Sequence, residues 1–180
     1  MNAWTRMILV LALFSLTSGA ALAFSYEATY PMIQEQAQKA LEQSVVNVIP
    51  GATEMSAIDK DGMTFYQGTD NDGNVKGIAF KATGSGFGGP IEIMVGYDPE
   101  QGVLTGIEII SMSETPGLGA KIKEANFTDQ FRGKSVEDNF VPKEDVDVIT
   151  GATISPTAVA NAIKSALAEA VNEYPVGGDL

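Results

Sequence analysis

Two threonines lie on either side of the two smallest residue types in the segment DVITGATIS, residues 147–155. Thr150 and Thr153 can each offer a hydroxyl group to a ligand. Gly151 and Ala152 between them leave room for a ligand to approach the backbone closely. The segment therefore combines accessible hydroxyl groups with an open backbone, but it contains no strong nucleophile.

The residues that follow these threonines are typical of a helix start. Ser155 is suited to the N-cap and Pro156 to the first helical position. Thr153 would then lie just outside the first turn, where free backbone N–H groups and the helix dipole favour an anion. A plain capped turn between a strand and a helix explains the same pattern, so the residues alone leave both interpretations open.

The composition excludes most other chemistry. The chain contains no histidine and no cysteine among its 180 residues. This rules out Ser-His and Cys-His nucleophile pairs, typical zinc sites, thiolate-bound iron–sulfur clusters and histidine-ligated haem. Any redox chemistry therefore needs a bound organic cofactor. We expect no metal site. The net charge of −12 argues against nucleic acid or anionic lipid as a partner, because phosphate recognition depends on clustered Lys and Arg.

The N-terminus contains a long uncharged segment between Arg6 and Glu27. A helix of about 20 residues spans a hydrocarbon core of about 30 Å. Because Arg6 is the only charged side chain before this segment, we expect a cytoplasmic N-terminus and export of the rest. We therefore expect residues 1–26 to form a transmembrane anchor and residues 27–180 an extracytoplasmic domain. The alternative is a signal peptide cleaved after Ala-Leu-Ala at 21–23.

The rest of the chain predicts one α+β domain, an antiparallel sheet with flanking helices. Two pairs of apolar segments separated by turns read as hairpins, at 63–68 with 75–83 and at 91–97 with 103–112. In the third of these strands, strict alternation places Ile91, Ile93, Val95 and Tyr97 on one face.

Three helices are expected in the same domain, at 31–48, 120–131 and 159–171. Pro31 suits the start of the first helix. Its predicted apolar face consists of Ile33, Ala37, Ala40, Leu41 and Val48.

Two further segments resemble motifs but predict turns. GSGFGG at 84–89 has the spacing of a dinucleotide-binding loop, yet Pro90 and an alternating strand follow it instead of a helix. DNDG at 70–73 resembles part of a calcium loop, but its first ligand position would be Gly68. We interpret both as tight connections.

The segment DVITGAT resembles the flavinylation motif of the FMN-binding domain family, Asp-x-x-Ser/Thr-Gly-Ala-Thr/Ser. SETPGLGAKI at 113–122, followed by DQFRGK, is similar to the Glu-Thr-Pro-Gly-Leu-Gly loop of that family, and GGPIEIMVGYD at 88–98 is a third match. The resemblance covers essentially the whole chain, with the motifs in the family's order. This family includes the G subunit of the Rnf electron-transport complex and the C subunit of the sodium-pumping NADH:quinone reductase. The short chain and single N-terminal span favour the Rnf G subunit.

The resemblance implies that the hydroxyl of Thr153 carries FMN through a phosphoester bond. Because a threonine hydroxyl without an adjacent base is a poor nucleophile, attachment needs an external enzyme. In this family that enzyme is a magnesium-dependent flavin transferase that takes FMN from FAD. Asp147 matches the acid of the motif and would serve recognition or activation during the transfer. Thr150, Gly151 and Ala152 would surround the phosphate.

The second motif would approach the isoalloxazine ring. The residues concerned are Glu114, Thr115, Gly117 and Leu118. Leu118 would shield one face of the ring, and Thr115 would offer hydrogen bonds.

Taken together, the resemblance implies that the chain is an electron carrier with covalently bound FMN in an ion-translocating ferredoxin:NAD oxidoreductase. We expect a single-pass protein of a bacterial or archaeal cell membrane, with its flavin domain on the outer face. Its partners would be the other membrane and redox subunits, and it would complete no reaction alone. One alternative is the C subunit of the quinone reductase. Another is a non-redox exported module that binds a phosphorylated ligand reversibly.

Overall fold

A computed structural model describes residues 2–60 and 62–178 of the chain. The expected segments 1–26 and 27–180 include Met1, Asp61, Asp179 and Leu180, which lie outside the described residues. By its internal contacts the chain divides into two compact units, Met1–Lys39 and Ala40–Leu180.

Helix α1 runs from Ala3 to Val48 without interruption. Among the described residues it is the one helix whose length and composition would allow it to cross a membrane. Its apolar side chains in the N-terminal part, such as Met7, Leu16 and Phe24, are exposed. The single apolar span expected at the N-terminus is therefore helical.

The predicted helix start at Pro31 is wrong, because Pro31 lies inside α1. Proline is tolerated there although it removes one backbone hydrogen bond of the helix. The predicted apolar face is also mostly wrong: Ile33, Ala37 and Ala40 are exposed, Leu41 is half-buried and only Val48 is buried. Helical spacing of apolar residues does not by itself show how much of a helix packs.

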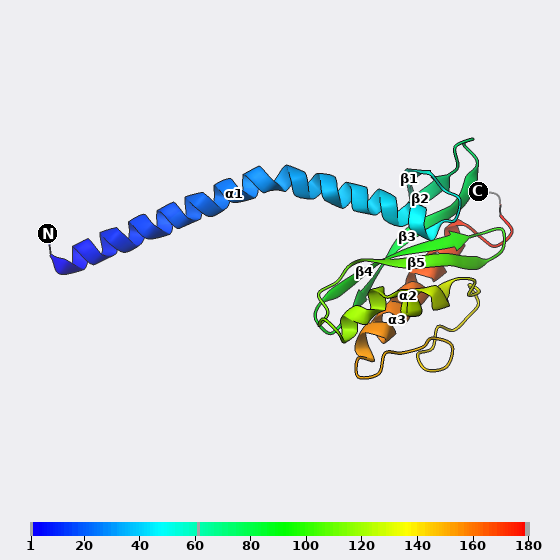
Figure 1. The fold of residues 1–180 in the computed structure, drawn as a ribbon. Coiled ribbons are helices and arrows are strands. Elements are labelled where there is room, and N and C mark those ends of the chain that lie inside the picture. Colours follow the sequence, from blue (N-terminus) through cyan, green and yellow to red (C-terminus); the bar gives the residue numbers. More distant parts are fainter. Residues whose placement is uncertain (1, 61, 179–180) are drawn as a thin grey trace. The chain divides into compact units, whose positions relative to one another are not determined.

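The second unit is built on a five-stranded sheet in which every neighbouring pair is antiparallel and the strands follow chain order (Figure 1). The strands are β1 (Glu54–Lys60), β2 (Met63–Thr69), β3 (Val75–Ser85), β4 (Pro90–Asp98) and β5 (Val103–Ser111). Both predicted hairpins are confirmed, as β2–β3 and β4–β5. Strand β1 was not predicted, and it is a largely exposed edge strand without clear alternation.

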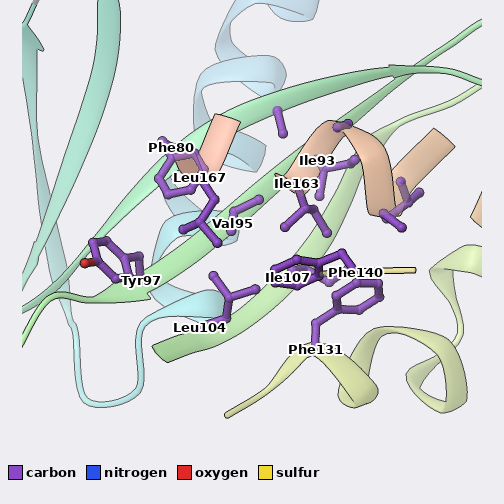
Figure 2. Packing of buried hydrophobic residues seen from close by; sticks show 14 of the residues in the cluster. Phe80, Ile93, Val95, Tyr97, Leu104, Ile107, Phe131, Phe140, Ile163 and Leu167 are labelled. Carbon is purple, nitrogen blue, oxygen red and sulfur yellow. The ribbon is translucent and has the colours of Figure 1, made fainter. Parts of the chain in front are cut away.

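The alternation of β4 divides its side chains between the two faces of the sheet. Ile93 and Val95 belong to the larger hydrophobic cluster, whereas Met94 between them packs in a smaller cluster with Val48 of α1. The predicted face of this strand is confirmed for Ile91, Ile93, Val95 and Tyr97. Figure 2 shows the larger cluster, with Ile163 of the C-terminal helix among the strand side chains.

Helix α3, Ile154–Glu173, covers the face of the sheet that carries this larger cluster. It contains the predicted helix 159–171, which is therefore confirmed. At its C-terminal end the hydroxyl of Tyr97 donates a hydrogen bond to the backbone oxygen of Tyr174 at 3.1 Å. Burial raises the pKa of Tyr97, and the nearby Asp98 raises it further. This bond joins the C-terminal end of α3 to β4.

The helix predicted at 120–131 is broken into three short pieces, so that prediction is only partly correct. They are η1 (Gly119–Lys123), α2 (Ala125–Thr128) and η2 (Asp129–Phe131). Glu124 interrupts the helix because its backbone is extended, with φ −72° and ψ 145°. The break allows Ile122 and Phe127 both to be buried in the larger cluster, with Phe131 stacked on Phe140 (Figure 2).

Candidate functional site

The motif that contains the two threonines forms a tight turn. The backbone N–H of Ala152 donates to the oxygen of Ile149 at 3.0 Å. Gly151 has φ +83°, a backbone region that residues with a side chain rarely adopt. A Cβ at Gly151 would meet only the Cδ2 of Leu118, at 4.0 Å, so the turn requires glycine for its conformation and not for space. Thr150 lies exposed on this turn.

Thr153 occupies the N-cap position of α3, since the helix begins at Ile154. Its side chain is exposed and makes no capping hydrogen bond. The prediction that Ser155 caps the helix is wrong, and Pro156 is the third helical residue instead of the first. Ser155 is buried and donates its hydroxyl to Glu114 Oε2 at 2.7 Å, a bond that competes with capping. The hydroxyl of Thr153 is consequently presented at the N-terminus of a 20-residue helix.

Glu114 is a buried acid that joins two other segments to its own. Its Oε2 accepts the hydrogen bond from Ser155, and its Oε1 accepts one from the backbone N–H of Gly88 at 3.0 Å. Gly88 lies in the connection between β3 and β4, the segment GSGFGG that resembled a dinucleotide loop. The structure shows a hairpin turn there, closed by a 2.9 Å bond from Gly86 N–H to the oxygen of Gly89, with a strand following it.

The loop after Glu114 turns back on itself and exposes a leucine. The backbone N–H groups of Leu118 and Ala120 both donate to the oxygen of Thr115, at 3.2 Å each. Gly117 has φ +77° in this turn. The Leu118 residue is 47% exposed, so its side chain is not part of either hydrophobic cluster.

These three segments enclose a pocket of about 270 Å³. Its lining residues are Phe87, Glu114, Thr115, Leu118, Gly119, Gly151, Ala152, Thr153, Ile154 and Ser155. Three of them form what we call the apolar collar: Phe87, Leu118 and Ile154, which are 73%, 47% and 51% exposed. The collar is unusual because large apolar side chains that are this exposed lie together beside a free hydroxyl.

The pocket brings together most of the residues that the two motifs predicted. Glu114, Thr115, Leu118, Gly151, Ala152 and Thr153 all line it. The pocket, as the described residues form it, is not lined by Gly117, Thr150 or Asp147. Asp147 is exposed, and its backbone N–H donates to Gln130 Oε1 at 2.6 Å.

Four lining residues were not predicted as site residues from the sequence: Phe87, Gly119, Ile154 and Ser155, of which Ser155 was expected only as a helix N-cap. Phe87 carried a usable signal, because it is the only large apolar residue in the glycine-rich run 84–89. Ile154 carried no such signal, because in the sequence it looks like an ordinary core residue of an amphipathic helix. Within residues 2–60 and 62–178, no cluster of three or more acidic, cysteine or histidine side chains could hold a metal ion.

Comparison with known proteins gives a consistent result. The model of a family described as FMN-binding domain matches residues 86–168. The chain is 32% identical to the G subunit of the ion-translocating oxidoreductase complex of Methanosarcina acetivorans, over 91% of this chain and 92% of that protein. It is 34% identical to the protein of the same name from Vibrio cholerae, over 92% of this chain and 89% of that protein.

Two solved structures resemble the fold. One is the C subunit of the Na⁺-translocating NADH-quinone reductase from Parabacteroides distasonis, with a TM-score of 0.62 and 18% identity, covering 82% of this chain and 96% of the other. The other is NqrC from Shewanella oneidensis, with a TM-score of 0.51 and 20% identity, covering 69% and 66%. At these identities the likeness concerns the fold.

Proposed function

The chain belongs to the family of ion-translocating oxidoreductase complex G subunits and contains their FMN-binding domain, and from this premise we propose that it is an electron carrier with FMN esterified to Thr153. One observation carries the proposal. The exposed hydroxyl of Thr153 lines the same pocket as the Glu114–Leu118 loop, although the two motifs are far apart in the chain.

The residues around Thr153 fit a phosphate group. Thr153 stands at the N-terminus of α3, where unpaired N–H groups and the helix dipole favour an anion. The turn at Gly151 keeps side chains away from this point, and Ala152 adds only a methyl group. These residues would hold the phosphate, and Thr150 would lie on the outer side of the same turn.

The apolar collar fits a flat aromatic ring. Phe87, Leu118 and Ile154 come from three separate segments and leave apolar surface exposed around the pocket. Apolar surface that the ring covers would stabilise the bound state by roughly 25 cal/mol per Å². Thr115 adds a hydroxyl at the same wall. In this arrangement the collar would position the ring while the ester prevents its loss.

Attachment requires an external enzyme. The carboxylate oxygens of Glu114, the acid in the pocket, accept hydrogen bonds from Ser155 and Gly88, and among the described residues no hydrogen bond joins this carboxylate to Thr153. We propose that a flavin transferase acts on Thr153, with FAD as donor. The oxygen–phosphorus bond to Thr153 forms as the bond between the two phosphates of FAD breaks, AMP leaves, and the hydroxyl proton is released. Exposed Asp147 is available for recognition by that enzyme.

The bound flavin would supply one-electron and two-electron transfer. The chain holds it at an exposed pocket, so that redox subunits of the same complex can approach it. Alone, the chain completes no reaction in this proposal. Ferredoxin and NAD are the terminal partners that we propose for the complex.

We further propose that residues 1–26 anchor the protein with its N-terminus in the cytoplasm. Support comes from the apolar part of α1 and from the position of Arg6 before it. The domain that follows, up to residue 180, would then lie on the outer face of the membrane.

The role of a G subunit is favoured over that of the quinone reductase C subunit. The chain is 32–34% identical to proteins named as G subunits, and 18–20% identical to the two solved structures from the quinone reductase. The other alternative, reversible binding of a phosphorylated ligand, makes a different prediction. Protein denatured and run on a gel keeps flavin fluorescence if the cofactor is esterified, and loses it if binding is reversible.

Leu118→Glu tests the placement of the ring. We expect full FMN attachment, a lower flavin midpoint potential and slower electron transfer, because a carboxylate beside the ring disfavours the more negative reduced state. At about 4 Å and an effective dielectric constant near 20, the repulsion is about 4 kcal/mol as an upper figure, and water screening reduces it. The midpoint potential is measured by redox titration, with Leu118→Gln as the uncharged control.

The melting temperature distinguishes the alternative for Leu118. Because this leucine is half-exposed and outside both hydrophobic clusters, its replacement should change the melting temperature little. An unchanged potential combined with a sharp fall in melting temperature would mean that Leu118 is a packing residue and that the ring lies elsewhere.

A further inference from the structure

Glu114 is the one acidic residue among the described residues that is both buried and part of the pocket wall. It is 8% exposed, and both of its carboxylate oxygens have hydrogen-bond donors. A carboxylate is an acceptor only, and the donors from Gly88 and Ser155 match that requirement. The group therefore joins the start of α3 to the β3–β4 connection through its own loop.

Glycine residues around this carboxylate leave space for it. A Cβ at Gly86 would lie 2.2 Å from Oε1, and a Cβ at Gly119 would lie 2.3 Å from Oε2. A Cβ at Gly88 would lie 1.9 Å from the backbone oxygen of Ser113. Any side chain at these three positions would displace the carboxylate or the loop that carries it. Close packing of three segments thus fixes the position of one acidic group.

No cation neutralises this acid within the part of the chain that the structure describes. The ion pairs found there are Lys39–Glu35 and Lys76–Asp70, and neither lies at the pocket. The donors to Glu114 are a hydroxyl and a backbone amide, which are both neutral. They stabilise the carboxylate and partly offset its charge, but they do not cancel it.

We propose that Glu114 is a positioning residue that also lowers the reduction potential of the flavin. Through Ser155 it holds the attachment helix, through Gly88 it holds the loop that carries Phe87, and its charge opposes reduction of a cofactor in the same pocket. The proposal rests on the proposed function, because it needs the flavin at Thr153. It differs from a purely structural role in requiring the charge.

Glu114→Gln separates the two parts of this proposal. The amide of glutamine can accept from Gly88 N–H with its oxygen and donate to the hydroxyl of Ser155 with its nitrogen, since a hydroxyl also accepts. The variant therefore keeps both connections and removes the charge. We expect unchanged FMN mass addition, little change in melting temperature and a higher midpoint potential than wild type. The full chain is purified in detergent after coexpression with a flavin transferase.

Ser155→Ala makes the opposite prediction for the potential. It keeps the carboxylate but removes a donor that partly offsets its charge, so the midpoint potential should fall below that of wild type. If the two substitutions only made the pocket less well ordered, the flavin midpoint potential would shift in the same direction in both variants. Glu169→Gln is the matched control, because Glu169 is an exposed acid in the distant part of α3. Its shift should be several times smaller than that of Glu114→Gln.

Opposite shifts in Glu114→Gln and Ser155→Ala, each larger than the control, would support the charge role. Equal potentials in wild type and Glu114→Gln, at full flavin occupancy, would overturn it. If Glu114→Gln failed to fold, Ser155→Ala would decide alone, and an unchanged or raised potential would contradict the proposal. Absence of covalent flavin from the wild-type chain would instead remove the proposed function, and the two failures are therefore distinguishable.

Discussion

Thr153→Ala is expected to abolish covalent attachment of FMN while the domain still folds. The substitution removes the side-chain oxygen that would form the bond to the phosphorus of FMN. Thr153 is exposed and its side chain makes no capping hydrogen bond, so the change in unfolding free energy should stay within about 0.5 kcal/mol. Intact mass spectrometry of the denatured protein measures attachment, and thermal unfolding of the same sample measures stability.

Two neighbouring substitutions serve as controls for Thr153→Ala. Thr153→Ser keeps a hydroxyl at the same position and should keep at least part of the flavin. Thr150→Ala removes the exposed hydroxyl on the other side of the Gly151 turn and should reduce occupancy less. Equal loss in Thr150→Ala and Thr153→Ala would show that the ester has been assigned to the wrong threonine. Full occupancy in Thr153→Ala would disprove the assignment outright.

The second large effect concerns the anchor. The full chain should remain in the membrane fraction after a high-salt wash, because about 20 uncharged residues match the thickness of the hydrocarbon core. A variant that begins after Phe24 should be soluble. It should also fold, since both hydrophobic clusters are formed by residues of the unit Ala40–Leu180. Membrane fractionation with immunodetection measures the distribution of both forms.

The N-terminal sequence of the mature protein decides between an anchor and a cleaved signal peptide. Retention predicts a chain that still contains residues 7–24. A mature chain that began at Phe24 would show that the segment is a cleaved signal. The electron-transfer role would then stand, with membrane attachment supplied entirely by the partner subunits.

The strands illustrate which parts of the fold the sequence can predict. Ile91, Ile93 and Val95 occupy alternate positions of β4 and all reach the larger cluster, because successive side chains of a strand point to opposite faces of the sheet. Strand β1 lies at the sheet edge with mostly exposed residues, so burial imposes little pattern on it. Pro31 shows the converse error, because a residue that favours a helix start is tolerated inside a longer helix.

The site was predictable only where local chemistry or the family resemblance applied. The glycines of its two turns, Gly117 and Gly151, follow from local conformation. Ser155 looked like an N-cap, but a long-range bond to Glu114 uses its hydroxyl. Such a bond joins residues far apart in the chain, and no local pattern indicates it. Ile154 was missed for a similar reason, because its place in the pocket wall depends on segments that are far away in the chain.

The central claim is that FMN is joined to this chain by a covalent bond at Thr153. The most direct test is the intact mass of the denatured full-length protein after coexpression with a flavin transferase. We predict an excess equal to one FMN less the water lost in the ester, and proteolysis should locate this excess on the peptide that contains Thr153. A mass equal to that of the unmodified chain, with flavin released on denaturation, would contradict the claim.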